Sequence, residues 1–191
     1  MKKVDRAWLK EYNACPDGYK FWCEHCEGQD TEQQLLTLVD YRSDWAWWVL
    51  TRLLTIEQNR KLAVFAAKEV LPIFEKEYPK DMRPQKAIEA AEKVIECNIG
   101  ENRAAARAAA DAARAAADAA WSAEAASAWA ARAARAAARA AADARSAAAA
   151  WAAYGAADAA WAVGYAADAW DAMKMKIMKY GLTLLEEDLD I

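Results

Sequence analysis

Residues 101–121, ENRAAARAAADAARAAADAAW, decide the fold, and the alanine-rich composition continues to residue 172. Alanine makes up 43 of the 69 residues from 104 to 172, and neither Gly nor Pro occurs there before Gly155. Alanine has the highest intrinsic helix propensity, so this region predicts long α-helices. Polar residues such as Arg107, Asp111 and Arg114 recur every three or four positions, which leaves continuous methyl faces for helix packing.

A single straight helix over this region would reach roughly 100 Å at 1.5 Å per residue, and its methyl faces would find nothing to pack against. We therefore expect two to four antiparallel helices. The breaks between them are predicted near residues 121–127, near residues 143–146, and near Gly155 or Gly164.

The segment from residue 55 to residue 98 is predicted to form a helical hairpin ahead of the alanine-rich region. Thr55 and Gln58 fit the T-x-x-Q pattern of a capping box, which satisfies free N–H groups at a helix start. Pro72 lies inside the apolar period that comes next, so we expect a kink there or a helix end just before it.

Residues 78–84, YPKDMRP, are predicted to be the turn of this hairpin. We expect Asp81 to cap the second helix and Pro84 to lie in its first turn, where a missing N–H costs nothing. A structural role also fits Arg83, whose guanidinium can bridge to Asp81 and hold the hairpin.

The predicted fold class is all-α, an antiparallel multi-helix bundle or array with long alanine-rich helices. Residues 1–98 form an aromatic-rich helical region with the hairpin, and residues 99–191 form the alanine-rich region. We expect the two to pack as one domain. The last helix is expected to end at Gly181, because glycine commonly marks the end of a helix.

Charge and hydropathy exclude several functional classes. The net charge of the 191 residues is −4, and no segment is basic enough to imply a nucleic-acid or membrane partner. The N-terminus lacks the apolar stretch of a secretory signal, and the longest charge-free stretch, residues 146–157, is too short to span a bilayer. We therefore expect a cytoplasmic protein with no membrane contact.

The four cysteines leave three interpretations open. Cys15, Cys23 and Cys26, with His25 between the last two, invite a zinc site to which Cys97 would be a distant ligand. Thiol redox chemistry is a weaker alternative, and reduced structural cysteines are the favoured one. We predict no metal and no cofactor.

An enzyme is not expected. His25 is the single histidine, and the sequence contains neither a phosphate-binding glycine loop nor a paired-histidine metal motif. Ser-His-Asp or Cys-His catalysis would have to use His25 beside Cys23 and Cys26, and close sequence neighbours on a helix do not face one another.

The candidate binding residues are aromatic and basic side chains of the alanine-rich region. Trp and Tyr there are either core plugs or contact anchors, and ten Trp exceed what a small core needs. The arginines could track phosphates, although interleaved Asp residues favour surface ion pairs instead. The predicted binding residues are Trp121, Trp129, Trp151, Tyr154, Trp161, Tyr165, Arg132, Arg135 and Arg139.

Several segments carry a family resemblance. The turn at residues 78–84, the sequence AIEAA at 87–91, and the upstream pieces ACPDG at 14–18 and DWAWW at 44–48 resemble an alanine-rich family of bacteria, prophages and phages. KYGLTLLEE at 179–187 fits the phage-borne branch as well. Members of this family are labelled immunity proteins. Asp81, Arg83 and Pro84 match its turn motif, and no catalytic residue carries over.

The resemblance implies an all-α protein with a role in conflict between mobile elements and their hosts. We expect a non-enzymatic protein that binds and inhibits a host defence protein, such as a CRISPR effector or another nuclease, or that neutralises a toxin. A nucleic-acid-binding accessory protein and a self-assembling structural protein, for instance a homodimer, are the alternatives.

Overall fold

The computed structural model describes residues 3–121, 125–143 and 167–186. Within these ranges the protein has nine α-helices and no β-strand, which confirms the predicted all-α array. The helices are α1 (Arg6–Glu11), α2 (Pro16–His25), α3 (Thr31–Tyr41), α4 (Ser43–Leu53), α5 (Ile56–Glu77), α6 (Arg83–Glu96), α7 (Gly100–Trp121), α8 (Ala125–Asp143) and α10 (Ala167–Glu186).

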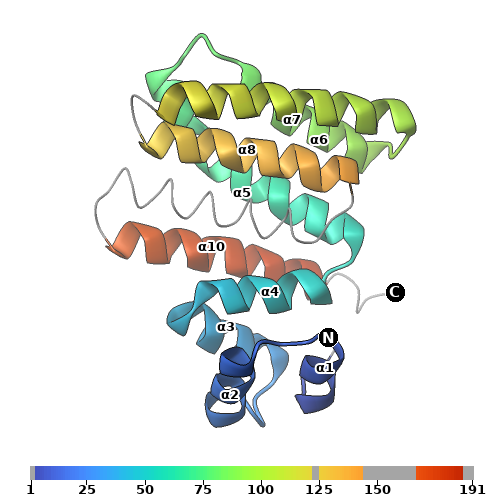
Figure 1. The fold of residues 1–191 in the computed structure, drawn as a ribbon, viewed down its shortest axis with the longest axis vertical. Helices are drawn as coiled ribbons and strands as arrows, with labels where there is room; N and C mark the ends of the chain where they lie inside the picture. Colours follow the sequence, from blue (N-terminus) through green and yellow to red (C-terminus); the bar gives the residue numbers. More distant parts are fainter. Residues whose placement is uncertain (1–2, 122–124, 144–166, 187–191) are drawn as a thin grey trace.

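The long helices stack in layers, and the short helices close one end of the stack (Figure 1). Helices α7 and α8 lie side by side at one end, and both contact the hairpin formed by α5 and α6. Helix α10 packs against α5 on one side and against α3 and α4 on the other. Helices α1 and α2 lie beyond α3 and α4, at the end opposite α7. No helix in the described ranges is long and apolar enough to cross a membrane.

Helices α7 and α8 pack through alanine methyl groups. The buried positions of α7 are spaced three or four apart, so they form one face, and the buried alanines of α8 nearly surround the helix. Small side chains let helix axes approach closely. The predicted break near residues 121–127 is confirmed, since α7 and α8 are separate helices that pack against each other. The break predicted near residues 143–146 falls where the described residues stop, so it stays a prediction. The breaks predicted at Gly155 or Gly164 lie outside the described residues.

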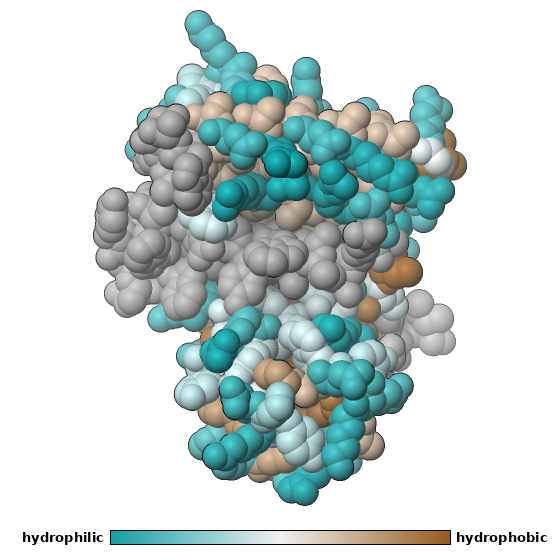
Figure 2. Space-filling view, viewed as in Figure 1, coloured by the Kyte–Doolittle hydropathy of each residue, from teal (hydrophilic) through white to brown (hydrophobic). Residues whose placement is uncertain are grey.

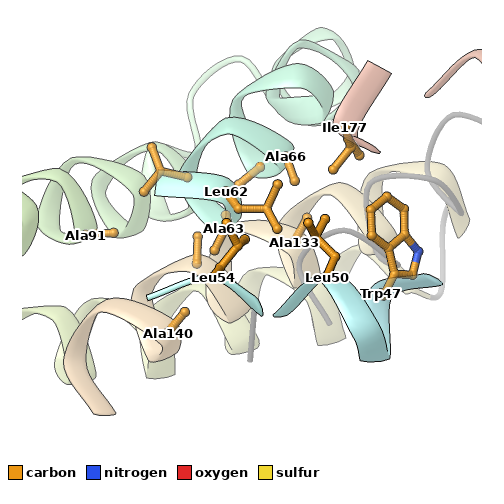
Figure 3. Close-up of a cluster of buried hydrophobic side chains, with 14 of the residues drawn as sticks. Trp47, Leu50, Leu54, Leu62, Ala63, Ala66, Ala91, Ala133, Ala140 and Ile177 are labelled. Atoms are coloured by element: carbon orange, nitrogen blue, oxygen red, sulfur yellow. The ribbon is translucent and has the colours of Figure 1, made fainter. Parts of the chain in front are cut away.

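Large side chains of α4, α5 and α10 belong to a buried cluster that also includes alanines of α8 (Figure 3). Trp47 and Leu50 of α4 point toward Leu62 of α5 and Ile177 of α10, and all four are fully buried. Gly181 lies against this cluster, because a Cβ there would stand 2.5 Å from Leu50 Cδ2. The prediction that Gly181 ends the last helix is therefore wrong. Helix α10 continues to Glu186, and the glycine permits a close approach to α4.

The first helix of the hairpin, α5, begins as predicted but continues further than predicted. The capping box is confirmed, since Gln58 N donates to Thr55 Oγ1 at 3.2 Å and Thr55 N donates to Gln58 Oε1 at 2.8 Å. Helix α5 runs through Pro72 to Glu77, so a helix end before Pro72 is wrong. Pro72 is exposed, as is Lys68 four residues earlier, whose carbonyl loses its N–H donor. Water can solvate that carbonyl, which lowers the cost of the missing bond.

The turn before α6 differs from the prediction by one residue. The residue in the capping position is Met82, not Asp81, and its side chain makes no cap hydrogen bond. The Asp81 carboxylate instead accepts from the Arg83 backbone N–H at 3.1 Å and pairs with the Arg83 guanidinium at 2.5 Å. These hydrogen bonds hold the pKa of Asp81 below its ordinary value. Pro84 is buried in the first turn, as predicted.

Candidate binding site: an aromatic pocket

A tight turn between α1 and α2 shapes one wall of a surface pocket. Asn13 lies just past the end of α1 with a φ of 55°, a left-handed conformation that asparagine tolerates better than most residues. Cys15 then caps α2, and its Sγ accepts from Gly18 N at 3.4 Å. A Cβ on Gly18 would lie 3.1 Å from that sulfur and 3.5 Å from the Trp45 ring. The absence of a side chain at Gly18 therefore lets α2 approach α4 closely.

The opposite wall comes from α4, whose tryptophans divide between the core and the surface. Trp47 is fully buried, whereas Trp45 and Trp48 are half-buried and line the pocket. A spacing of three residues puts Trp45 and Trp48 on one side of the helix. In the DWAWW segment, one tryptophan ring therefore packs in the core and the other two line the pocket.

The pocket encloses about 430 Å³ and is mainly apolar. Such a volume falls in the range of small-molecule and side-chain binding sites. Figure 2 shows apolar groups among the polar side chains at the end of the molecule formed by the short helices, whereas polar side chains cover much of α7 and α8. The lining residues are Leu9, Asn13, Ala14, Cys15, Gly18, Trp22, Leu38, Arg42, Asp44, Trp45, Trp48 and Val49.

Aromatic rings extend the apolar surface beyond the pocket on both sides. On one side Phe21 stacks on Tyr41 with ring centroids 4.0 Å apart and meets Trp45 at 5.7 Å. On the other side Trp8 stacks on Tyr12 at 4.5 Å and meets the edge of Trp48 at 5.8 Å. Tyr41 is 62% exposed and Tyr12 is 40% exposed, so both edges of this surface reach solvent.

Two arginines cover ring faces of the pocket tryptophans. The Arg42 guanidinium lies 4.7 Å from the Trp45 ring centroid and makes two 3.0 Å hydrogen bonds to Asp44. The Arg52 guanidinium lies 4.0 Å from the Trp48 ring and donates to the Trp48 carbonyl at 3.0 Å. Burial lowers the pKa of Arg52. These contacts hold the rings in place, and the one carboxylate of the lining is already bound by Arg42. The arrangement suits the binding of an apolar group better than acid–base chemistry.

The cysteines and His25 do not assemble into a metal site. Cys15 is exposed at the pocket, Cys97 is exposed after α6, and Cys26 is fully buried, where burial raises the pKa of its thiol to about 11. His25 is exposed and packs against Phe21. In the described part of the chain, no three His, Cys, Asp or Glu side chains are placed to hold a metal ion.

The predicted arginine stripe forms an ion-pair ladder between α7 and α8, made of Arg107, Asp111, Arg139 and Asp143. Arg107 Nε lies 2.8 Å from Asp143 Oδ1, and Arg139 Nη2 lies 2.8 Å from Asp111 Oδ1. Arg139 also approaches Asp143 within α8, at 3.8 Å. The two pairs cross between helices that run in opposite directions, and each cation of the ladder is matched by a carboxylate.

The other predicted residues of α7 and α8 have less uniform surroundings. Arg135 is half-buried, and burial first, then the nearby Arg114 and Arg139, lower its pKa. Arg132 is exposed, with its guanidinium 4.8 Å from the half-buried ring of Trp129, which packs on the core. Trp121 is the last residue of α7. The remaining predicted contact residues, Trp151, Tyr154, Trp161 and Tyr165, lie outside the described residues.

The pocket was not predicted from the sequence, although both of its walls carry a recognisable signal. ACPDG contributes Ala14, Cys15 and Gly18, and DWAWW contributes Asp44, Trp45 and Trp48. The two segments are about 30 positions apart, so their shared position depends on how α2 packs on α4. A local clue is that each segment contains an aspartate suited to a helix start, Asp17 in the first and Asp44 in the second.

No family model, curated protein or solved structure matches this chain. The resemblance to the alanine-rich family therefore stays an expectation from the sequence, and the geometry of the pocket is the stronger basis for a functional assignment.

Proposed function

We propose that this chain is a non-enzymatic binding protein that acts by stoichiometric contact with another protein. The observation that carries the proposal is the pocket between Trp45 and Trp48, continued by the exposed rings of Tyr12 and Tyr41. Tryptophan and tyrosine are the residues most enriched at the centres of protein interfaces. An apolar surface that is both hollowed and flanked by rings fits a partner's side chain and the area around it.

The class of partner comes from the sequence resemblance. An immunity-type role would make the target a host defence protein, such as a CRISPR effector or another nuclease, or a toxin. Binding at the pocket would then block the target's own working surface, which needs no catalysis by this chain.

Nucleic acid is less well supported as the partner. The ion-pair ladder matches Arg107 and Arg139 with carboxylates, which would have to be displaced before phosphates could bind. Arg132 is the most exposed of the predicted arginines on α8, and it is engaged with Trp129. Self-association through the aromatic surface is the second alternative, and it predicts a dimer.

The test is capture from host lysate with nuclease treatment, comparing the natural chain with two matched variants. Ala14→Phe fills the pocket without removing a wall residue, and Ala105→Phe places the same ring on an exposed position of α7. We expect one protein to be captured by the natural chain and by Ala105→Phe, and to be lost with Ala14→Phe. Equal capture by all three would overturn the proposed site.

Two further outcomes would favour the alternatives. Recovery that collapses on nuclease treatment would point to nucleic acid instead of a protein partner. A dimer in light scattering that Ala14→Phe converts to a monomer would point to self-association. Thermal melting measured by circular dichroism shows whether each variant is folded before its binding is interpreted.

A further inference from the structure

The charge of the molecule divides between its two ends. Residues 3–54, which contain α1 to α4, carry six Lys or Arg against nine Asp or Glu, a net charge of −3. Helices α7 and α8 together carry six Arg against four Asp or Glu, a net charge of +2. The aromatic pocket therefore lies in the negative part of the protein.

The arginines in the pocket region are engaged by their own neighbours. Arg6 makes two 2.6 Å hydrogen bonds to Glu27, and Arg42 makes two 3.0 Å hydrogen bonds to Asp44. Arg52 covers Trp48 and is bonded to its carbonyl. Because Arg42 and Arg52 already lie on faces of Trp45 and Trp48, those faces are not open to a cation from a partner. The lining is mainly apolar, so an apolar entering group gains most from the pocket.

Three exposed carboxylates that lie within two residues of a pocket residue or an outer ring along the sequence have no such engagement. Glu11 lies two residues before Asn13, Asp17 lies between Cys15 and Gly18, and Asp40 lies next to Tyr41. All three are exposed, and none has an ion pair among the described residues. The exposed Lys10 and Lys20 lie close to Glu11 and Asp17 in the sequence, and the net charge of −3 already includes them. Their field at short range attracts positive charge and speeds association with it.

We propose that the pocket takes one large apolar side chain presented on a positively charged segment of the partner, with Glu11, Asp17 and Asp40 meeting the cations of that segment. This inference rests on the proposed function and makes its partner specific. A basic surface with an exposed apolar side chain is the feature that the partner must have. A small apolar molecule would fill the pocket but would leave the outer rings and the carboxylates unused.

The test uses three labelled 12-residue peptides and the full chain, with binding measured by fluorescence anisotropy. One peptide carries a single Trp among Lys and Ser residues, the second has Ala in place of Trp, and the third has Glu in place of each Lys. We expect the basic Trp peptide to bind at least roughly tenfold more tightly than either of the others, a difference of about 1.4 kcal/mol. Its affinity should fall as salt is raised, since the attraction is screened.

Charge-reversed variants show which carboxylates cause the preference for the basic peptide. Glu11→Lys with Asp17→Lys should remove most of the preference for the basic peptide. The matched control, Glu77→Lys with Glu89→Lys, makes the same charge change on α5 and α6 and should leave the preference intact. Ala14→Phe should weaken the basic Trp peptide and leave the Ala peptide unchanged.

The outcomes separate this inference from the proposed function. Equal binding of the acidic and basic Trp peptides, lost with Ala14→Phe, would overturn the charge inference and leave the pocket as a protein-binding site. Equal binding of the basic Trp and Ala peptides would overturn the apolar anchor. Binding of no peptide, together with a small molecule retained in native mass spectrometry and expelled by Ala14→Phe, would overturn both proposals.

Discussion

The two ends of this molecule are helical for different reasons. Helices α7 and α8 are built from alanine, which favours the helix in each residue and packs through methyl groups. Helices α1 to α4 are short, between 6 and 11 residues, and such helices are marginal on their own in water. They depend on the burial of large rings such as Trp22 and Trp47. One end is therefore a framework of small residues, and the other end carries larger aromatic and charged side chains.

Removal of the most buried ring should produce the largest loss of stability. Trp47 is fully buried among α4, α5 and α10, so Trp47→Ala deletes its contacts and leaves a cavity. We expect a loss of about 3–5 kcal/mol in the free energy of unfolding, measured by urea denaturation. Tyr41→Ala, at an exposed ring of the same end, should cost far less.

A conservative change at the same position sharpens this result. Trp47 Nε1 has no hydrogen-bond partner among the described residues, so Trp47→Phe removes area without breaking a hydrogen bond. Trp47→Phe should recover most of the stability that Trp47→Ala loses. An equal loss for both variants would contradict burial as the source of the effect.

The Cys26 thiol should make the aromatic end sensitive to alkaline pH. Burial raises the pKa of Cys26 from 9.0 to about 11, so the folded chain keeps its proton where the unfolded chain releases it. The free energy of unfolding should therefore be unaffected by this group below pH 9 and fall as the pH rises from about 9 to about 11. The contribution is on the order of 2–3 kcal/mol, at about 1.36 kcal/mol for each unit.

Other groups also titrate in this range, so the effect of Cys26 is isolated by comparing how steeply the free energy of unfolding falls with pH in three proteins. Urea unfolding at several pH values should show a shallower alkaline decline in Cys26→Ala than in the natural chain. Cys97→Ala removes an exposed thiol and should leave the decline unchanged. Parallel declines in all three proteins would rule out Cys26 as a source of the pH dependence.

A larger side chain on the buried face of α7 should lower the free energy of unfolding by overpacking the alanine-rich end. Ala113 is fully buried in α7, where its methyl group faces neighbouring helices, so Ala113→Leu introduces volume that the packing cannot accept. We expect a loss of about 1–3 kcal/mol by urea denaturation. Ala115→Leu, two residues later on the exposed side of the same helix, should change stability by no more than about 0.5 kcal/mol. A similar loss in both variants would mean that helix propensity, not packing, controls this end.

The features that were predicted best from the sequence are those that depend on local chemistry. The all-α class follows from helix propensity, and the capping box at Thr55 follows from the T-x-x-Q pattern. Gly181 and Pro72 were misread because their effects depend on tertiary surroundings, the close approach of Leu50 in one case and solvent exposure in the other. A local signal for a helix end carries no information about how closely a neighbouring helix approaches.

The candidate site was the least predictable part of the molecule. Its walls lie on α1, α2, α3 and α4. They meet because the chain turns at Asn13 and because Gly18, which has no side chain, lets the Trp45 ring pack closely against α2. The prediction that Asp residues neutralise the arginine stripe holds, but the closest pairs join α7 to α8 instead of residues within one helix. Pairing across helices depends on their register, which alanine repeats specify weakly because shifted alignments look alike.

Because alanine repeats specify the register weakly, we expect the ion-pair ladder to help align α7 with α8, although its own energy should be the smallest effect of all. Arg139 and Asp111 lie 2.8 Å apart, with 39% and 63% of their side chains exposed, so solvent screens the pair. A double-mutant cycle of Arg139→Ala and Asp111→Ala should give a coupling of about 0.2–1 kcal/mol that shrinks as salt is raised. The Arg114–Asp118 pair, at 3.7 Å within α7 and more exposed on the arginine side, should couple less.

If the ladder sets the register, charge-swapped Arg139→Asp with Asp111→Arg should restore the unfolding cooperativity that either single reversal weakens. Cooperativity unchanged in both single reversals would assign the alignment of α7 and α8 to their methyl faces alone.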